Sequence, residues 1–103
     1  MKNKNMNAFA ISMNKENGVL TVTLEGRLDK ITTLTAEKMI AEEMQDQSEL
    51  VLDLVKLEYI SSAGIRMLVS LHKQFRDRRM TIINVRPTVR ELLSLGNLTN
   101  YLL

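Results

Sequence analysis

Hydrophobic and polar positions alternate along the first quarter of the chain. Apolar residues recur at every second position over residues 9–13 and again over residues 19–24. A period of two is typical of a β-strand with one buried face. Between these stretches lies Asn17-Gly18, a pair that strongly favours a tight hairpin turn. The pattern therefore predicts a β-hairpin that ends at Gly26, preceded by a flexible polar lead over residues 1–7.

Three later segments repeat apolar residues at helical spacing. The first predicted helix runs to about Gln45, its apolar repeat includes Leu34, and a threonine near its start is expected to cap it. The second runs from about Ser62 to Arg76, and the third begins at Pro87, a residue that suits the first position of a helix. The candidate capping residues of the first helix are Thr32, Thr33 and Thr35.

Two short, nearly all-apolar runs, residues 50–55 and 80–85, lie between these helices. Such runs are typical of strands that are buried on both faces of a parallel sheet. A strand–helix–strand unit of this kind pairs its strands in parallel through a right-handed crossover. The element order β-β-α-β-α-β-α predicts one α/β domain over residues 8–103. We expect a four-stranded mixed β-sheet with the helices packed on it.

Composition narrows the possible functions. A chain of 103 residues suffices for one domain, and this one has no cysteine and a single histidine, His72. We therefore expect no disulfide framework and no zinc site. The formal net charge of +2 is too small to indicate nucleic-acid binding, and Arg76, Arg78 and Arg79 are interpreted as a solvated helix end. No apolar run approaches the roughly 18 residues of a membrane span, so a cytoplasmic protein without membrane binding is expected.

The most informative segment is Ser61-Ser62-Ala63-Gly64, which lies where a loop becomes the longest amphipathic stretch. Backbone N–H groups are free at a helix N-terminus, and the helix dipole favours negative charge there. A hydroxyl in this place can cap the helix, attack an electrophile or carry a phosphate. Capping is the commonest of these roles and contributes about 1 kcal/mol.

The enzymatic roles fit the segment poorly. A Gly-x-Ser-x-Gly nucleophile elbow around Ser62 would need glycine where Ile60 stands. His72 lies ten residues downstream on the same predicted helix, which places it roughly 15 Å away, too far to act as a general base. No glycine-rich run ends in Gly-Lys-Ser/Thr, so the chain is not expected to bind ATP itself. We therefore expect neither an enzyme nor a bound cofactor.

A covalent phosphate fits the physics of the segment better. It would add about −1.5 to −2 charges and three acceptor oxygens. The helix that carries it tolerates this charge through its free N–H groups and its dipole. A partner that presses an apolar or acidic surface on the loop would not tolerate it. A phosphoserine here would therefore control binding without unfolding the domain.

Several segments of the chain together resemble the STAS domains of the anti-sigma factor antagonist (anti-anti-sigma factor) family. Residues 50–54, Leu-Val-Leu-Asp-Leu, and residues 59–68, Tyr-Ile-Ser-Ser-Ala-Gly-Ile-Arg-Met-Leu, carry the closest similarity. Gly26-Arg27-Leu28-Asp29 is similar to the family's Gly-x-Leu-Asp pattern after the second strand. Residues 83–93 resemble its last strand and helix. The resemblance extends over nearly the whole chain.

The resemblance implies a partner-switching protein. Such proteins bind an anti-sigma factor that is also a serine kinase; phosphorylation of a loop serine ends binding, and a PP2C-type phosphatase restores it. The implied phosphoacceptor is Ser62, with Ser61 as the alternative, because Ser61 stands where the family often has aspartate. The implied partner-binding residues are Asp29, Ser61, Ser62, Ala63, Gly64 and Arg66. A monomer or weak homodimer is expected.

Alternatives remain open for the chain and for single residues. The chain could be a STAS subunit of a larger complex, such as a lipid transporter, without phosphorylation, or, with less support, a small serine hydrolase. Asp29 could be a helix-entry acid instead of a partner contact. Asp53 could lie at the interface or hold its own loop together. Arg66, one turn after the serines, could pair with a phosphate or with an acidic partner.

Overall fold

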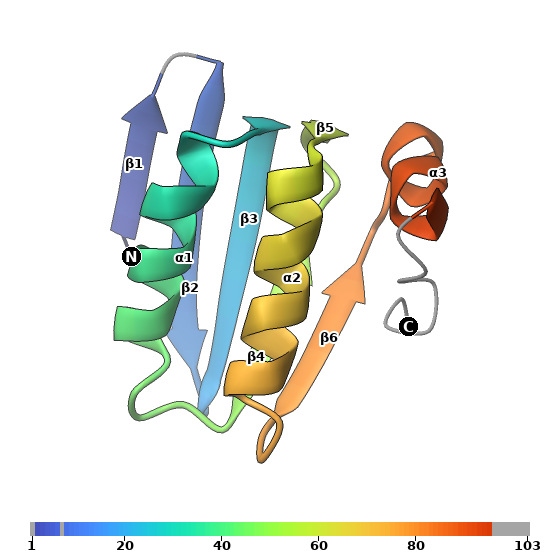
Figure 1. The fold of residues 1–103 in the computed structure, drawn as a ribbon. Helices are drawn as coiled ribbons and strands as arrows, with labels where there is room; N and C mark the ends of the chain where they lie inside the picture. The colour runs from blue at the N-terminus through green and yellow to red at the C-terminus, as the bar shows by residue number, and fades with distance from the viewer. Residues whose placement is uncertain (1, 7, 96–103) are drawn as a thin grey trace.

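The computed structural model describes residues 2–6 and 8–95, and these form six strands and three helices (Figure 1). The strands are β1 (Lys2–Met6), β2 (Phe9–Glu16), β3 (Val19–Leu28), β4 (Glu49–Asp53), β5 (Leu57–Ile60) and β6 (Arg79–Ile83). The helices are α1 (Thr32–Glu43), α2 (Ser62–Gln74) and α3 (Pro87–Leu95). The predicted α/β class with a mixed sheet is confirmed, although the sheet has six strands where the sequence pattern predicts four.

One sheet contains all the strands, in the order β1-β2-β3-β4-β6, with β5 paired to β3. The predicted hairpin forms between β2 and β3, where Glu16 faces Val19 across the turn. The pairs β3–β4 and β4–β6 are parallel, as the strand–helix–strand pattern predicts. Although β4 lies between two parallel neighbours, only alternate residues, Leu50 and Leu52, are fully buried, so the predicted burial of this strand on both faces is wrong.

Two strands lie where the sequence pattern predicts none. The lead over residues 1–7 was expected to be loose, but β1 pairs antiparallel with β2, from Lys2 opposite Met13 to Met6 opposite Phe9. Backbone pairing at a sheet edge needs no apolar alternation in the added strand, so the polar sequence of β1 gave no signal. The second unexpected strand, β5, has only four residues and pairs with the far end of β3.

Gly26 explains how β3 reaches β5. The sequence pattern predicts that the strand ends at this glycine, yet β3 continues to Leu28 through an irregularity between Gly26 and Arg27. Gly26 has φ +92°, and a Cβ atom there would lie 2.1 Å from the carbonyl oxygen of Ala8. Only glycine fits this backbone. As a result, β3 ends beside β5, with Leu28 opposite Ile60. Ile60 immediately precedes Ser61-Ser62-Ala63-Gly64, the serine loop.

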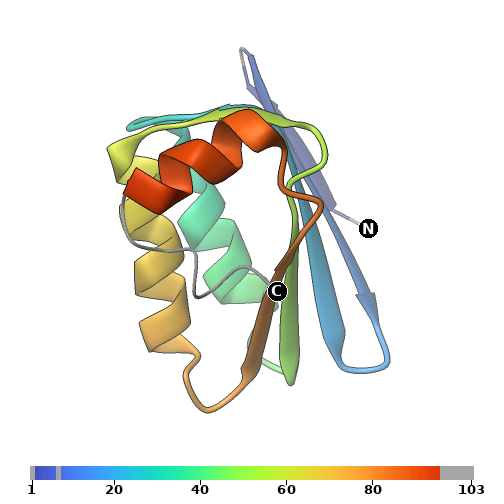
Figure 2. The same cartoon turned by 90° about the vertical axis from the view of Figure 1, so that its right-hand side faces the viewer.

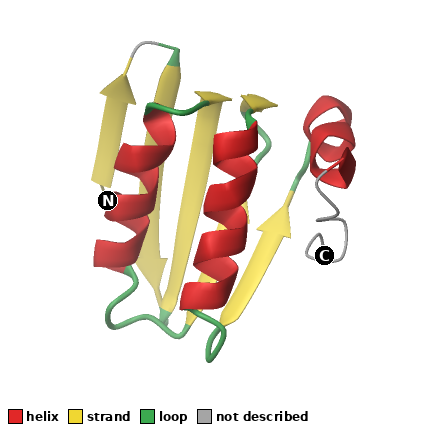
Figure 3. Ribbon diagram, viewed as in Figure 1, coloured by secondary structure: helices red, strands yellow, loops and turns green. Residues whose placement is uncertain are grey.

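The helices α1 and α2 cover one face of the sheet, and α3 lies near β5 at one end of it (Figures 1, 2 and 3). The buried core lies between the sheet and these helices. Leu34 is an exception to the predicted apolar repeat of α1, because its side chain is 74% exposed. The sequence also predicts a short apolar tail that packs back on the domain; its residues, Leu98, Tyr101, Leu102 and Leu103, lie outside the described ones.

Arg78 connects the C-terminal end of α1 to the C-terminal end of α2. The sequence-based interpretation of this arginine as part of a solvated helix end is therefore wrong. Its Nη1 group donates hydrogen bonds to the carbonyl oxygens of Met44 and Gln47, and its guanidinium lies 5.2 Å from the Phe75 ring centroid. These carbonyls follow the last turn of α1, which ends at Glu43. A cation that binds helix-terminal carbonyls stabilises the helix end.

We therefore expect Arg78→Ala to lower the free energy of unfolding by about 1.5–3 kcal/mol, the usual range for hydrogen bonds from a charged group. Denaturant unfolding would measure this. Arg76→Ala, a change at an exposed arginine two residues earlier, is the control and should stay within about 0.5 kcal/mol of wild type. Equal effects of the two substitutions would show that Arg78 does not hold the end of α1.

Candidate functional site

The serine loop lies at the end of the sheet where β3 and β5 finish side by side. The backbone N–H of Ser61 donates to the carbonyl oxygen of Leu28 at 2.9 Å, which fixes the loop to the end of β3. Asp29 follows Leu28 directly, so two predicted site residues, Asp29 and Ser61, are neighbours at this rim. The N-termini of α1 and α2 lie at the same end of the sheet (Figure 1).

Ser61 is the residue that caps α2. Its backbone is extended, with φ −87° and ψ 173°, and its Oγ accepts a hydrogen bond from the N–H of Gly64 at 3.2 Å. This is the standard N-cap geometry, in which a side-chain oxygen satisfies a free N–H of the first turn. The capping role that the sequence left open between the serines therefore belongs to Ser61.

Replacing the cap should be visible as a loss of stability. We expect Ser61→Ala to lower the free energy of unfolding by about 1 kcal/mol, because the N–H of Gly64 loses its acceptor. Ser61→Asp, which retains an acceptor oxygen, should remain close to wild type. Thermal unfolding of the two variants measures the difference, and an undisturbed midpoint in Ser61→Ala would show that the cap contributes nothing.

Ser62 is the first residue of α2 and has a different environment from Ser61. Its side chain is exposed, and within residues 2–6 and 8–95 its hydroxyl has no hydrogen-bond partner. The hydroxyl is therefore free to react, and a group attached to it would project from the helix N-terminus into solvent. The structure separates the two adjacent serines into one structural hydroxyl and one accessible hydroxyl.

Gly64 is buried between the start of α2 and the ends of β3 and β5, and it is not part of the exposed surface of the serine loop. It is buried, and a Cβ atom there would lie 2.6 Å from Cγ1 of Ile60 and 3.1 Å from the carbonyl oxygen of Leu28. The inclusion of Gly64 among surface contacts is therefore corrected: its missing side chain lets α2 start close to β3 and β5. Ala63 is half-buried, whereas Arg66 is exposed one turn along α2.

Asp29 caps α1. Its Oδ1 accepts hydrogen bonds from the backbone N–H groups of Ile31 and Thr32, each at 3.0 Å. In return, the Thr32 hydroxyl accepts from the N–H of Asp29 at 2.8 Å, a reciprocal arrangement similar to a capping box. Thr32 thus contributes to the start of α1 as predicted, but the principal acceptor is the carboxylate. The backbone hydrogen bond from Thr32 holds the pKa of Asp29 below its ordinary value, with a smaller contribution from Arg27.

This lowered pKa predicts the sign of a pH effect. A carboxyl group whose pKa is lower in the folded state than in the unfolded state, about 3.9, stabilises the fold above that value. The stabilisation is lost as pH falls through the folded-state pKa. We expect the stability advantage of wild type over Asp29→Asn to be largest at pH 7 and to shrink as pH falls below about 3.9. Thermal midpoints of both proteins across this range measure it; a constant difference would contradict the assignment.

Asp53 has a structural role in its own loop. Its Oδ1 accepts from the backbone N–H of Val55 at 3.0 Å and from Nδ2 of Asn84 at 3.1 Å. Arg86 adds a hydrogen bond from Nε to the carbonyl oxygen of Val55 at 2.7 Å. These contacts fix the connection between β4 and β5, which delivers β5 to the end of β3. Of the two alternatives for Asp53, the structure supports the loop-holding role.

A cavity of about 380 Å³ opens beside Ser62, between α2, β5 and α3. Its walls are mainly apolar, and Arg66 is the charged side chain among the described residues that line it. The lining residues are Tyr59, Ile60, Ser62, Ile65, Arg66, Leu92 and Leu95. The exposed hydroxyl of Ser62 and the guanidinium of Arg66 therefore border one concave surface.

Exposed apolar side chains at the start of α1 were missed by the sequence pattern. Ile31 is 70% exposed and Leu34 is 74% exposed, and both lie at the end of the fold that carries Asp29 and the serine loop. Large apolar residues that are exposed at this level beside a candidate site are typical of protein-binding surfaces. Ile31 lies immediately before α1 and Leu34 in its first turn, and only the fold shows that this helix start lies beside the serines.

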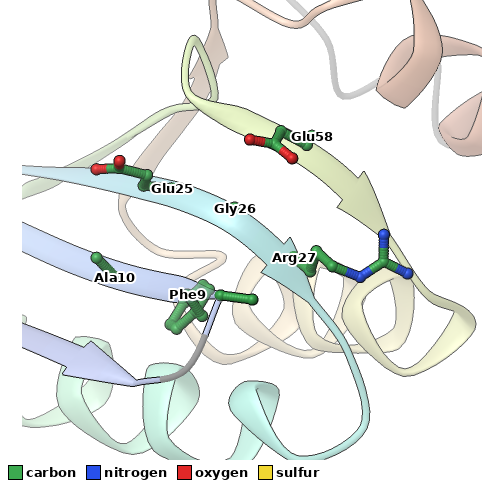
Figure 4. A pocket seen from close by; sticks show the side chains of 7 residues that line it. Phe9, Ala10, Glu25, Gly26, Arg27 and Glu58 are labelled. Atoms are coloured by element: carbon green, nitrogen blue, oxygen red, sulfur yellow. The ribbon is translucent and has the colours of Figure 1, made fainter.

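A second cavity, of about 420 Å³, lies around Gly26 (Figure 4). The carboxylates of Glu25 and Glu58 come from the neighbouring strands β3 and β5, and Phe9 lies at the base of the hairpin. Arg27 also borders it and stacks 4.3 Å from the ring centroid of Tyr59. No serine, threonine or histidine is among the described residues of its lining, so it offers no hydroxyl for modification.

Comparison with known proteins decides the family. The sequence profile of the STAS domain matches residues 10–102. The chain belongs to the STAS domain family. The protein BtrV of Bordetella bronchiseptica, named as an anti-sigma factor antagonist, is 31% identical over 89 residues, which cover 84% of this chain and 77% of BtrV. The resemblance that the serine loop and its flanking strands suggest is thereby confirmed.

Solved structures show the same STAS fold. An anti-sigma factor antagonist from Mycobacterium paratuberculosis superposes with a TM-score of 0.83 at 21% identity, covering 93% of this chain and 84% of that one. The Bacillus protein SpoIIAA, an anti-sigma factor antagonist, gives a TM-score of 0.81 in its unphosphorylated form at 15% identity, covering 90% and 85%. Its phosphorylated form gives 0.73 at 14% identity, covering 90% and 88%. None of the STAS domain's helices, within the part described, is long and apolar enough to cross a membrane.

Proposed function

We propose that this STAS domain is an anti-sigma factor antagonist that binds an anti-sigma factor with serine kinase activity. Phosphorylation of Ser62 by that kinase ends the binding, and a PP2C-type phosphatase restores it. The observation that carries the proposal is that the hydroxyl groups of the two adjacent serines have different environments. Ser61 is occupied as the cap of α2, whereas Ser62 is exposed and has no hydrogen-bond partner among the described residues. The names of BtrV and SpoIIAA support the same function.

The chemistry that Ser62 would undergo requires a partner enzyme. Its Oγ attacks the γ-phosphorus of ATP, the bond from phosphorus to the β–γ bridging oxygen breaks, and ADP leaves. The hydroxyl proton passes to a base of the kinase, and the later hydrolysis of the phosphoserine releases inorganic phosphate. The STAS domain supplies an accessible nucleophile and no base: the only histidine, His72, lies ten residues along α2, roughly 15 Å from Ser62.

The start of α2 accepts the phosphate without unfolding. Free backbone N–H groups and the positive end of the helix dipole stabilise negative charge on Ser62. The capping hydrogen bond from Ser61 to the first turn does not involve the modified oxygen. Phosphorylation therefore changes the surface that the partner meets and leaves the fold intact.

The proposed binding surface joins polar and apolar groups at one rim. Ser62, Ala63 and Arg66 lie at the start of α2, and Ile31 and Leu34 lie at the start of α1. The apolar pair would supply contact area, and a charged phosphate brought against it would be desolvated without compensation. Asp29 and Ser61 hold the two helix starts in place and border the same surface. We propose that the domain acts in the cytoplasm as a monomer or weak homodimer.

Mass spectrometry tests the phosphorylation site. After incubation with ATP and the cognate anti-sigma factor kinase, the intact mass of wild type and of Ser61→Ala should rise by one phosphate. Ser62→Ala should remain unmodified. Modification of Ser62→Ala but not of Ser61→Ala would assign the acceptor to Ser61, and no modification of wild type would favour a STAS subunit that is not phosphorylated.

A chemical probe addresses the hydrolase alternative. A fluorophosphonate reacts with serines that an adjacent base activates, and we expect no adduct at Ser62. Because no base lies within reach of this hydroxyl among the described residues, labelling there would contradict the binding function and favour catalysis.

A further inference from the structure

The helix α2 places Ser62 and Arg66 four residues apart, on the same side of the helix. Both residues line the cavity between α2, β5 and α3. Arg66 is exposed, and among the described residues it has no hydrogen bond or ion pair. An arginine without a partner therefore borders the same concave surface as the free hydroxyl.

We propose that the phosphate on Ser62 is held by Arg66 of the same helix, so that phosphorylation also withdraws this guanidinium from the binding partner. The inference rests on the proposed function, because it assumes that Ser62 is phosphorylated. It adds a second consequence to the modification. The partner would lose a positive contact at the moment that it meets a negative charge.

The geometry favours the pairing. Residues four apart on a helix are neighbours on its surface, and the favourable order places the anion N-terminal to the cation. The rise between them is about 6 Å along the axis, a distance that an arginine side chain can span. Its planar guanidinium can donate two parallel hydrogen bonds to a phosphate, which a lysine cannot reproduce.

The charges around the cavity leave Arg66 as the principal candidate. Besides Ser62 and Arg66, the described lining residues carry no formal charge at neutral pH: Tyr59 and Ile60 of β5, Ile65 of α2, and Leu92 and Leu95 of α3. The guanidinium of Arg27 stacks over the ring of Tyr59, one of the lining residues, at 4.3 Å from the ring centroid. No described carboxylate lines the cavity to compete with the phosphate for Arg66.

The pairing also defines the chemistry of the partner. In the unphosphorylated complex, Arg66 is available to a carboxylate of the kinase. Once Ser62 is phosphorylated, the net local charge of the pair changes from about +1 to about −1 at pH 7. An acidic group of the partner then faces repulsion where it had an ion pair.

The test installs phosphoserine at residue 62 during translation, so that no kinase is needed. Phosphorus NMR then follows the second ionisation of the phosphate, which ordinarily has a pKa of about 6. We expect a pKa lower by about half a unit or more in wild type than in Arg66→Gln, because the guanidinium favours the dianion. Arg66→Lys should fall between them, and Arg76→Gln, two residues beyond the far end of α2, should match wild type.

Equal phosphate pKa values in wild type and Arg66→Gln would overturn the pairing. The result is independent of kinase labelling, so a failure here is distinguishable from a failure of the proposed function. In a second measurement, unmodified Arg66→Gln should bind the anti-sigma factor kinase about tenfold more weakly than wild type does. Unchanged affinity would overturn the claim that phosphorylation withdraws a partner contact.

Discussion

Replacing Ser62 by aspartate should weaken binding to the anti-sigma factor kinase by at least about thirtyfold, with little change in stability. An uncompensated charge buried in an interface costs about 2–5 kcal/mol, and each 1.4 kcal/mol changes the affinity tenfold. The same charge at the first position of α2 is tolerated by the helix, so the thermal midpoint should stay within about 4 °C of wild type. Isothermal titration and thermal unfolding measure the two effects.

Two control variants separate charge from size and from position. Ser62→Asn has nearly the shape of Ser62→Asp without its charge, and it should retain most of the affinity. Gln74→Glu adds one negative charge at the exposed far end of α2, and it should bind as wild type does. If Ser62→Asp and Ser62→Asn weaken binding equally, steric exclusion and not charge controls the partner.

Replacing Gly64 by alanine should destabilise the domain by about 1–3 kcal/mol, although glycine-to-alanine changes inside helices usually stabilise by up to about 1 kcal/mol. The added Cβ would lie 2.6 Å from Cγ1 of Ile60 and 3.1 Å from the Leu28 carbonyl oxygen. The start of α2 must therefore move away from the ends of β3 and β5. Denaturant unfolding measures the change in the free energy of unfolding. A decrease indicates that close packing dominates, whereas an increase indicates that helix propensity dominates.

A double-mutant cycle identifies the contact. Ile60→Ala removes the Cγ1 atom that the new methyl group meets, so Gly64→Ala should cost less in that background than in wild type. If the cost is the same in both backgrounds, the conflict arises at Leu28, whose carbonyl oxygen and Cδ2 atom are the next nearest atoms. A stabilising Gly64→Ala would contradict the close approach of α2 to the sheet.

The sequence predicts the elements that depend on periodicity and local turn chemistry. The alternation in β2 and β3, the Asn17-Gly18 turn and the apolar run of β4 each have one physical explanation, and each forms as predicted. By contrast, β5 is too short for a periodic signal and exists because β3 continues past Gly26. Its formation depends on the close approach of the Ala8 backbone, a tertiary contact that no local pattern contains.

The sequence predicts which segment forms the candidate site, but it does not predict which hydroxyl group makes which hydrogen bond. Adjacent serines before a helical repeat indicate a helix start, yet the spacing alone cannot assign the cap. That assignment depends on the extended backbone of Ser61, which the hydrogen bond to Leu28 fixes. The resemblance implies Gly64 as a partner-binding residue, whereas in the structure its small size allows α2 to pack closely against Ile60 and Leu28.

Asp29 and the serine loop meet for the same tertiary reason. They are more than thirty residues apart in the chain, and the pairing of β3 with β5 places them at one rim. Each caps its own helix through a side-chain oxygen, so both helix N-termini are fixed at the edge that bears Ser62. These hydrogen bonds hold the backbone from which the accessible hydroxyl of Ser62 extends.

One titration series tests reversible switching most directly. The dissociation constant of the anti-sigma factor kinase would be measured for the unmodified domain, for the domain phosphorylated at Ser62, and for the same sample after phosphatase treatment. We expect tight binding, then binding weaker by at least about thirtyfold, then full recovery. Equal affinity in all three states would contradict the central claim that a phosphate on Ser62 controls the partner.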